Sequence, residues 1–159
     1  MQWNFELIVK PSEPPLTEGP VWDGEHLYFT HIQASRIMRY DPKSGAITVA
    51  REGTNRTNGL AHDAHGKLFG CCSGGRSGVR FDDDKITTLC DNFEGKRLNT
   101  PNDLAIDRKG RIWFTNPVNS GNWDKGSTME VDHQSVFRLD PQADGKYTIT
   151  RVTFDTTMP

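Results

Sequence analysis

The chain has 159 residues, with 19 Lys and Arg against 21 Asp and Glu, which gives a formal net charge of −2. This balance provides no basic surface for nucleic acid or for an anionic membrane, so we expect neither as a partner. Hydrophobic residues make up 34% of the sequence and never form a run long enough to cross a bilayer.

The predicted elements follow a pattern that occurs three times: a polar pair, an apolar run, a Gly-centred hairpin turn and a second apolar run. The turn glycines are Gly24, Gly66 and Gly110, which lie about 42 and 44 residues apart. The blades of a β-propeller repeat at about 40–45 residues and contain four short strands each. The sequence therefore predicts an all-β fold built from propeller blades.

The strands of the first unit are predicted at residues 21–22, 27–30, 35–40 and 46–50, where aromatic, β-branched or alternating residues occur. Asp41 and Pro42 open the turn before its outer strand. In the later units the clearest outer strands are residues 78–81, 86–89, 136–139 and 147–150. No window has a helical period, which supports the all-β class.

These units predict three blades, at about residues 16–52, 53–93 and 94–155. The third unit is the longest because a polar, Gly-rich segment, residues 116–130, follows one of its inner strands. Loops on rigid scaffolds often carry binding residues. Two interpretations of Trp123 in this segment stay open: stacking on a sugar-like ring, or packing against its own blade.

The three polar pairs start with Glu18, Asn58 and Asn102, at equivalent places in successive units. Equivalent places in a propeller converge on its central axis, so we expect three oxygen-bearing side chains to face one another. Simpler interpretations remain, since Glu18 could be a solvated carboxylate. The Asn58-Gly59 and Asn102-Asp103 steps are also ordinary turn signals.

The start of the chain and the cysteines indicate the compartment. Residues 1–6 contain no basic region followed by an apolar stretch, so no secretory signal is expected. The three cysteines lack the spacing of a disulfide framework, which favours free thiols and a cytoplasmic location. Adjacent Cys71 and Cys72 on one strand should point to opposite faces of a sheet.

Two segments, residues 18–22 and 98–104, resemble motifs of the gluconolactonase / senescence marker protein (regucalcin) family. Residues 94–97 and 107–117 extend the resemblance, which runs from about residue 15 to residue 159. The Asn-Thr-Pro-Asn-Asp segment is the specific part. The resemblance implies a six-bladed propeller, of which this chain would form about three blades, the N-terminal half. It also implies hydrolysis of a sugar-acid lactone, such as glucono-1,5-lactone, with a divalent metal.

The resemblance also implies a set of site residues. Glu18 and Asn102 would be metal ligands, and such oxygen donors suit Ca²⁺, with Mg²⁺ or Zn²⁺ as alternatives. Arg97 and Arg56 would hold sugar hydroxyls, although an arginine such as Arg97 is more often a surface charge. The predicted substrate-binding residues are Asn58, Arg97, Asp103, Arg56 and Trp123.

The family resemblance further implies an asparagine after a Met-Pro pair, and an aspartate one blade later that completes the metal site and serves as base. Neither is present in these 159 residues, so the catalytic residue is left unassigned and this chain alone is expected to be a poor catalyst. The alternative is a non-catalytic partial propeller that binds metal or a protein partner. Its open blade edges would favour self-association. A third interpretation is that the chain is one part of a longer protein.

Overall fold

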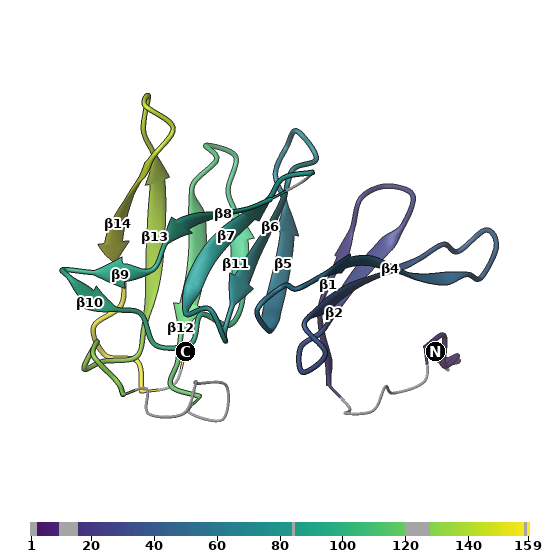
Figure 1. The fold of residues 1–159 in the computed structure, drawn as a ribbon, viewed down its shortest axis with the longest axis horizontal. Coiled ribbons are helices and arrows are strands. Elements are labelled where there is room, and N and C mark those ends of the chain that lie inside the picture. Colours follow the sequence, from purple (N-terminus) through teal and green to yellow (C-terminus); the bar gives the residue numbers. More distant parts are fainter. Residues whose placement is uncertain (1–2, 10–15, 84, 120–127, 158) are drawn as a thin grey trace.

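The computed structural model describes residues 3–9, 16–83, 85–119, 128–157 and 159, and all of the regular structure there is β-strand. The strands form three four-stranded antiparallel sheets and one two-stranded hairpin (Figure 1). This confirms the all-β prediction. The described residues include no helix that is long and apolar enough to cross a membrane.

Each sheet is a meander in which consecutive strands are neighbours. The strands of the first sheet are β1 (Thr17–Trp22), β2 (Leu27–His31), β3 (Arg36–Tyr40) and β4 (Ile47–Glu52). Those of the second are β5 (Thr57–His62), β6 (Leu68–Cys72), β7 (Ser77–Phe81) and β8 (Ile86–Cys90). Those of the third are β11 (Leu104–Ile106), β12 (Ile112–Asn116), β13 (Ser135–Pro141) and β14 (Tyr147–Arg151). These strand ranges define the sheets, and the predicted blade boundaries at about residues 16–52, 53–93 and 94–155 remain predictions.

The first strands of the three sheets, β1, β5 and β11, follow one another along a shared inner side, with β5 in contact with both others. In each sheet the strand order runs from this first strand to the fourth, β4, β8 or β14, at the opposite edge. Four-stranded meanders arranged in this way are blades of an open partial propeller, as predicted from the repeat.

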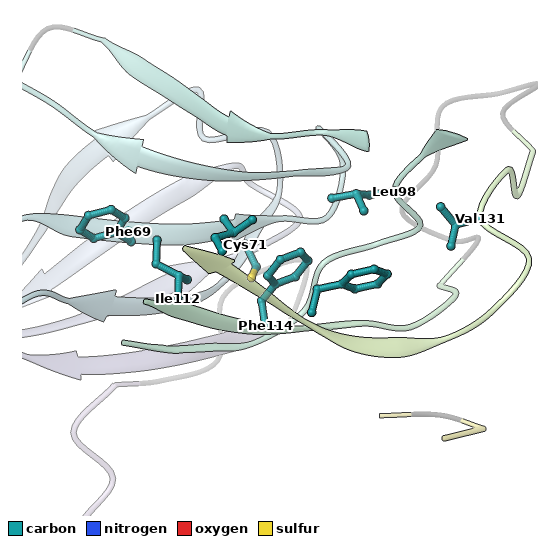
Figure 2. Close-up of a cluster of buried hydrophobic side chains, with 8 residues drawn as sticks. Phe69, Cys71, Leu98, Ile112, Phe114 and Val131 are labelled. Atoms are coloured by element: carbon teal, nitrogen blue, oxygen red, sulfur yellow. The ribbon is translucent and has the colours of Figure 1, made fainter. Parts of the chain in front are cut away.

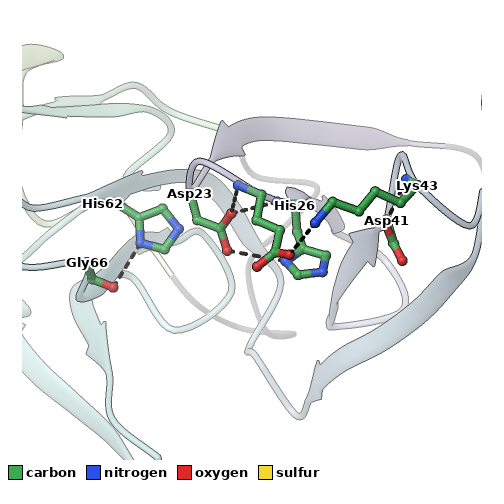
Figure 3. Close-up of polar contacts among 7 residues, drawn as sticks. Asp23, His26, Asp41, Lys43, His62 and Gly66 are labelled. Carbon is green, nitrogen blue, oxygen red and sulfur yellow. Dashed lines mark hydrogen bonds and ion pairs between the residues drawn. The ribbon is translucent and has the colours of Figure 1, made fainter.

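Aspartates close the hairpin turns at the Gly-centred positions. Asp23 Oδ1 accepts the N–H groups of Glu25 and His26, at 2.7 and 2.6 Å (Figure 3). Asp63 and Asp107 do the same in the next two sheets, each bonding two backbone N–H groups of its turn. The carboxylate accepts backbone N–H groups two to four residues further along the chain, which is why an Asp recurs at the start of each turn.

Apolar side chains fill the spaces between sheets. One cluster lies between the second and third sheets and includes Phe69, Cys71, Ile112 and Phe114 (Figure 2). A second cluster, between the first and second sheets, contains Ile37, Leu60, Cys72, Val79 and Phe81. Cys71 and Cys72 belong to different clusters, so the prediction that they point to opposite faces is confirmed.

Two features differ from the elements expected from sequence. Strand β1 begins at Thr17 rather than near Val21, so the first polar pair lies inside a strand. The register with β2 shifts between Glu18 and Val21, a bulge that accommodates the Gly-Pro step. The hairpin of β9 (Asn92–Phe93) and β10 (Lys96–Arg97) was not predicted, because each of its strands has only two residues.

Candidate functional site

The recurring polar pairs meet where the inner strands lie side by side. The Gly59 N–H donates to the Asn102 carbonyl at 2.7 Å, which connects the second and third sheets. Thr30 Oγ1 lies 3.0 Å from the Asn58 carbonyl and 3.1 Å from the Glu18 carbonyl, bridging the first and second sheets. The backbone at residues 18, 58 and 102 is thus linked in one series. We call Glu18, Asn58, Asn102 and Asp103 the hub.

Two glycines allow this close approach. A Cβ atom built on Gly19 would collide with the Asn58 carbonyl oxygen, and one built on Gly59 would collide with Asp103 and lie 2.9 Å from the Asn102 carbonyl. Real Cβ atoms essentially never approach so closely, so only glycine fits at either place. Glycine at residues 19 and 59 therefore holds the polar residues of adjacent sheets close together.

The hub side chains present oxygen donors. Asn58 is 7% exposed, Asn102 is half-buried and Glu18 is exposed. In the part of the chain that the structure describes, no hydrogen bond engages these three side chains. Asp103 Oδ1 accepts the Leu104 N–H at 2.9 Å. Within the described part of the chain, the side-chain oxygens of Glu18, Asn58 and Asn102 thus have no hydrogen-bond partner, whereas Asp103 Oδ1 has one.

This donor set suits a hard divalent cation. Ca²⁺ accepts carboxylate and amide oxygens together with water, in a flexible geometry. Among the described residues no group of three or more His, Cys, Asp or Glu side chains could hold a metal. A cation at the hub would therefore rely on amide oxygens and water beside Glu18, which fits Ca²⁺ better than it fits Zn²⁺.

A buried arginine that was not predicted, Arg76, binds the segment that leads into the hub. Arg76 is 2% exposed, and its Nε donates to the carbonyls of Leu98 and Asn99, at 2.6 and 3.2 Å. Burial lowers the pKa of this guanidinium. By binding carbonyls of the segment before Asn102, Arg76 fixes the path of the chain into the hub. Its only sequence signal is an arginine at the end of a Gly-rich strand connection.

The structure brings Arg56 and Arg97, predicted to bind substrate, to one groove of about 510 Å³. Arg56 lies in the connection between β4 and β5, and Arg97 ends β10. Trp123, the remaining predicted substrate-binding residue, lies outside the described residues. The structure thus links the backbones at residues 18, 58 and 102 and places Arg56 and Arg97 in one groove. Glu18 also lines an open groove on the first sheet, and Asp103 lines one on the third.

The connection from the groove to the hub is short. Arg56 is two residues before Asn58, and Ser73 Oγ donates to the Pro101 carbonyl at 2.9 Å, next to Asn102. The connections β2–β3, β4–β5 and β6–β7 all contribute to the groove. Groove and hub are therefore neighbouring parts of the same end of the sheets.

Comparison with known proteins gives one family. The SMP-30/gluconolactonase/LRE-like region matches residues 16–159. A gluconolactonase of Zymomonas mobilis is 29% identical over 152 residues, which are 85% of this chain and 43% of the relative. The pentonolactonase XacC of Haloferax volcanii is 32% identical over 103 residues, 62% of this chain and 33% of the relative.

Solved structures agree with the sequence comparison. The gluconolactonase XC5397 of Xanthomonas campestris superimposes with a TM-score of 0.77 at 33% identity, covering 86% of this chain and 46% of that one. A regucalcin from Agrobacterium tumefaciens has a TM-score of 0.60 at 19% identity, which supports the fold alone. The chain thus spans about half the length, or less, of the relatives it matches.

Proposed function

Because the chain belongs to the SMP-30/gluconolactonase/LRE-like family, we propose that it contributes the metal-binding half of a sugar-lactone hydrolase. The observation that carries the proposal is the hub, in which Glu18 in β1, Asn58 in β5 and Asn102 just before β11 come from three successive sheets. A sugar-acid lactone, such as glucono-1,5-lactone, is the proposed substrate. The gluconolactonases among its relatives support this substrate class.

We propose a divalent cation, preferably Ca²⁺, as the cofactor, with Glu18 and Asn102 as its ligands. When bound, such an ion supplies a Lewis acid that polarises the ester carbonyl of the lactone. Asn58 lines the hub and orients the substrate, and Asp103 accepts a hydrogen bond from a sugar hydroxyl. Arg56 and Arg97 bind the far end of the substrate from the groove. Trp123 remains a proposed stacking partner for the sugar ring.

The experiment follows acid release from glucono-1,5-lactone in Ca²⁺ and in chelator. We expect turnover above the spontaneous rate only with Ca²⁺, and its loss in Glu18→Gln. The matched control is Glu25→Gln, since Glu25 is an exposed carboxylate of the β1–β2 turn that pairs with Lys43 at 2.8 Å (Figure 3). Equal rates in Ca²⁺, in chelator and in Glu18→Gln would overturn the catalytic proposal.

A second candidate function is a non-catalytic partial propeller that binds another protein, and one observation favours it. The third sheet carries an apolar groove of about 260 Å³, with Ala105, Trp113 and Val136 on a face that packs against no described sheet. The first sheet carries one of about 330 Å³ beside Pro20 and Leu27. Because relatives of this fold are about twice as long, we propose that these faces pack against a second copy of the chain.

We also keep the cytoplasm as the proposed location. Burial raises the pKa of Cys72 to about 11 and that of Cys90 to about 12, so these thiols stay protonated at neutral pH. All three cysteines are free. Free, buried thiols are typical of proteins in a reducing compartment.

A further inference from the structure

The groove that holds Arg56 and Arg97 is built from three strand connections that are fastened to one another. The Arg56 N–H donates to Ser35 Oγ at 3.1 Å, and the Ser73 N–H donates to the Arg56 carbonyl at 3.2 Å. The Gly75 N–H donates to the Asn55 carbonyl at 3.3 Å. These bonds connect β2–β3, β4–β5 and β6–β7, so the walls of the groove form one unit.

The two arginines flank consecutive glycines. A Cβ atom on Gly74 would lie 3.2 Å from Arg56 Cδ, so the Arg56 stem runs along this residue. Arg97 Nη2 donates to the Gly75 carbonyl at 3.4 Å, which places its guanidinium beside the next residue. The absence of a side chain on Gly74 therefore leaves room for the Arg56 stem at the groove.

The described residues that line the groove include two arginines and no acid, although the chain as a whole carries −2. In the described part of the chain, no carboxylate pairs with the Arg97 guanidinium. The Glu130 carboxylate instead accepts the Arg97 backbone N–H at 3.0 Å. Burial and the charge of Arg97 lower the pKa of the nearby Arg76, while the charge of Glu130 raises it. Arginine forks bind planar or tetrahedral oxyanions through paired hydrogen bonds.

We propose that this groove binds the oxyanion of a phosphorylated sugar acid or of its lactone, while the sugar end lies at the hub. The proposal rests on the proposed lactone hydrolase function for the identity of the sugar, but not for the anion site itself. It assigns Arg56 and Arg97 a charge-recognition role, where hydroxyl binding alone was expected. Such a site selects substrates with a phosphate over neutral lactones.

The test measures binding by calorimetry, in chelator so that the hub metal takes no part. The probes are 6-phospho-D-gluconate, D-gluconate and inorganic phosphate. We expect 6-phospho-D-gluconate to bind, with D-gluconate at least roughly tenfold weaker, because a doubly charged phosphate gains more from two guanidinium groups. Inorganic phosphate binding as tightly as 6-phospho-D-gluconate would leave an anion site but overturn the sugar-acid assignment.

Single substitutions test which arginines bind the phosphate. Arg97→Gln and Arg56→Gln should each weaken 6-phospho-D-gluconate binding at least roughly tenfold, and Arg97→Lys should give an intermediate loss. The matched control is Arg108→Gln, on the exposed β11–β12 turn. No measurable binding by the folded wild type, or equal losses in Arg97→Gln and Arg108→Gln, would overturn the proposal. Failure of the hydrolase assay with intact anion binding would instead count against the proposed function alone.

Discussion

Gly59 and Asn102 are joined by a backbone hydrogen bond of 2.7 Å that crosses from the second sheet to the third. The bond forms because a hydrogen atom occupies the place of a Cβ at residue 59, beside Asp103 and the Asn102 carbonyl. The hub therefore depends on a close contact between the backbones of two sheets, and this contact determines where the hub side chains start.

We predict that Gly59→Ala destabilises the fold and disrupts the hub. The added methyl group meets backbone atoms that cannot move without separating the sheets. Overpacking of this kind costs about 2–3 kcal/mol, which lowers the melting temperature by roughly 5–10 °C for a chain of this size. Gly66→Ala is the comparison, since its Cβ meets nothing within 4 Å and only its φ of +76° is unfavourable. An equal or smaller loss in Gly59→Ala would contradict the close-contact argument.

Calcium should stabilise the folded chain through the hub. A ligand that binds only the native state adds stability that grows with its concentration, about 2.7 kcal/mol at 100 times its dissociation constant. We therefore expect a concentration-dependent rise in melting temperature with Ca²⁺. The rise should disappear in Glu18→Gln and persist in Glu25→Gln. A similar rise in all three proteins would show that Ca²⁺ binds elsewhere.

The sequence predicted the periodic parts of this fold better than the contacts between its units. The turns at Gly24, Gly66 and Gly110 are local, since an Asp and a Gly within a few residues determine each one. The inner strand β1 was placed too late, because Glu18, Gly19 and Pro20 have low strand propensity and are held by the neighbouring sheet. Sequence propensity contains no information about that neighbour.

Arg76 shows a second limit of prediction from sequence. Its partners, the carbonyls of Leu98 and Asn99, are more than 20 residues away and have no side-chain signal. By contrast, Glu18, Asn58 and Asn102 could be proposed from the sequence because they occupy equivalent positions of a repeat, and the structure links their backbones. The ligand roles of these residues remain predictions until metal binding is measured.

The ionised Asp82 carboxylate should stabilise the folded chain, and this contribution to the free energy of unfolding should be lost at low pH. Hydrogen bonds from Arg80 and Thr87 lower the pKa of Asp82 to about 2, from an ordinary value of 3.8. Because the folded pKa is the lower one, this stability is complete above about pH 4 and disappears as the pH falls toward 2. The carboxylate is partly exposed, so we expect a contribution of roughly 1 kcal/mol.

Urea titrations of Asp82→Asn measure that contribution. The variant should be less stable than wild type at pH 7, and the difference should shrink between pH 4 and pH 2. Asp83→Asn serves as the control because Asp83 is the exposed neighbour. A difference that stays constant from pH 7 to pH 2 would show that the charge of Asp82 is not its cause.

Self-association should depend on the open face of the third sheet. Trp113 lies on this face with Arg111 and Arg138 over its ring, at 5.5 and 5.4 Å from the ring centroid. Val136 lies beside it in the apolar groove. Covering this face with another sheet removes apolar surface from water, at about 25 cal/mol per Å². We expect light scattering coupled to gel filtration to show a dimer whose share rises with protein concentration.

A charged substitution on that face distinguishes specific dimerisation from nonspecific association. Val136→Lys should shift the protein toward monomer, since a buried ammonium without a partner is costly. Ala64→Lys adds the same charge at an exposed position of the β5–β6 turn and should leave the dimer intact. A monodisperse wild-type monomer at high concentration would refute the proposed pairing. Equal dissociation in both variants would mean that net charge controls association, because only Val136 lies in the groove.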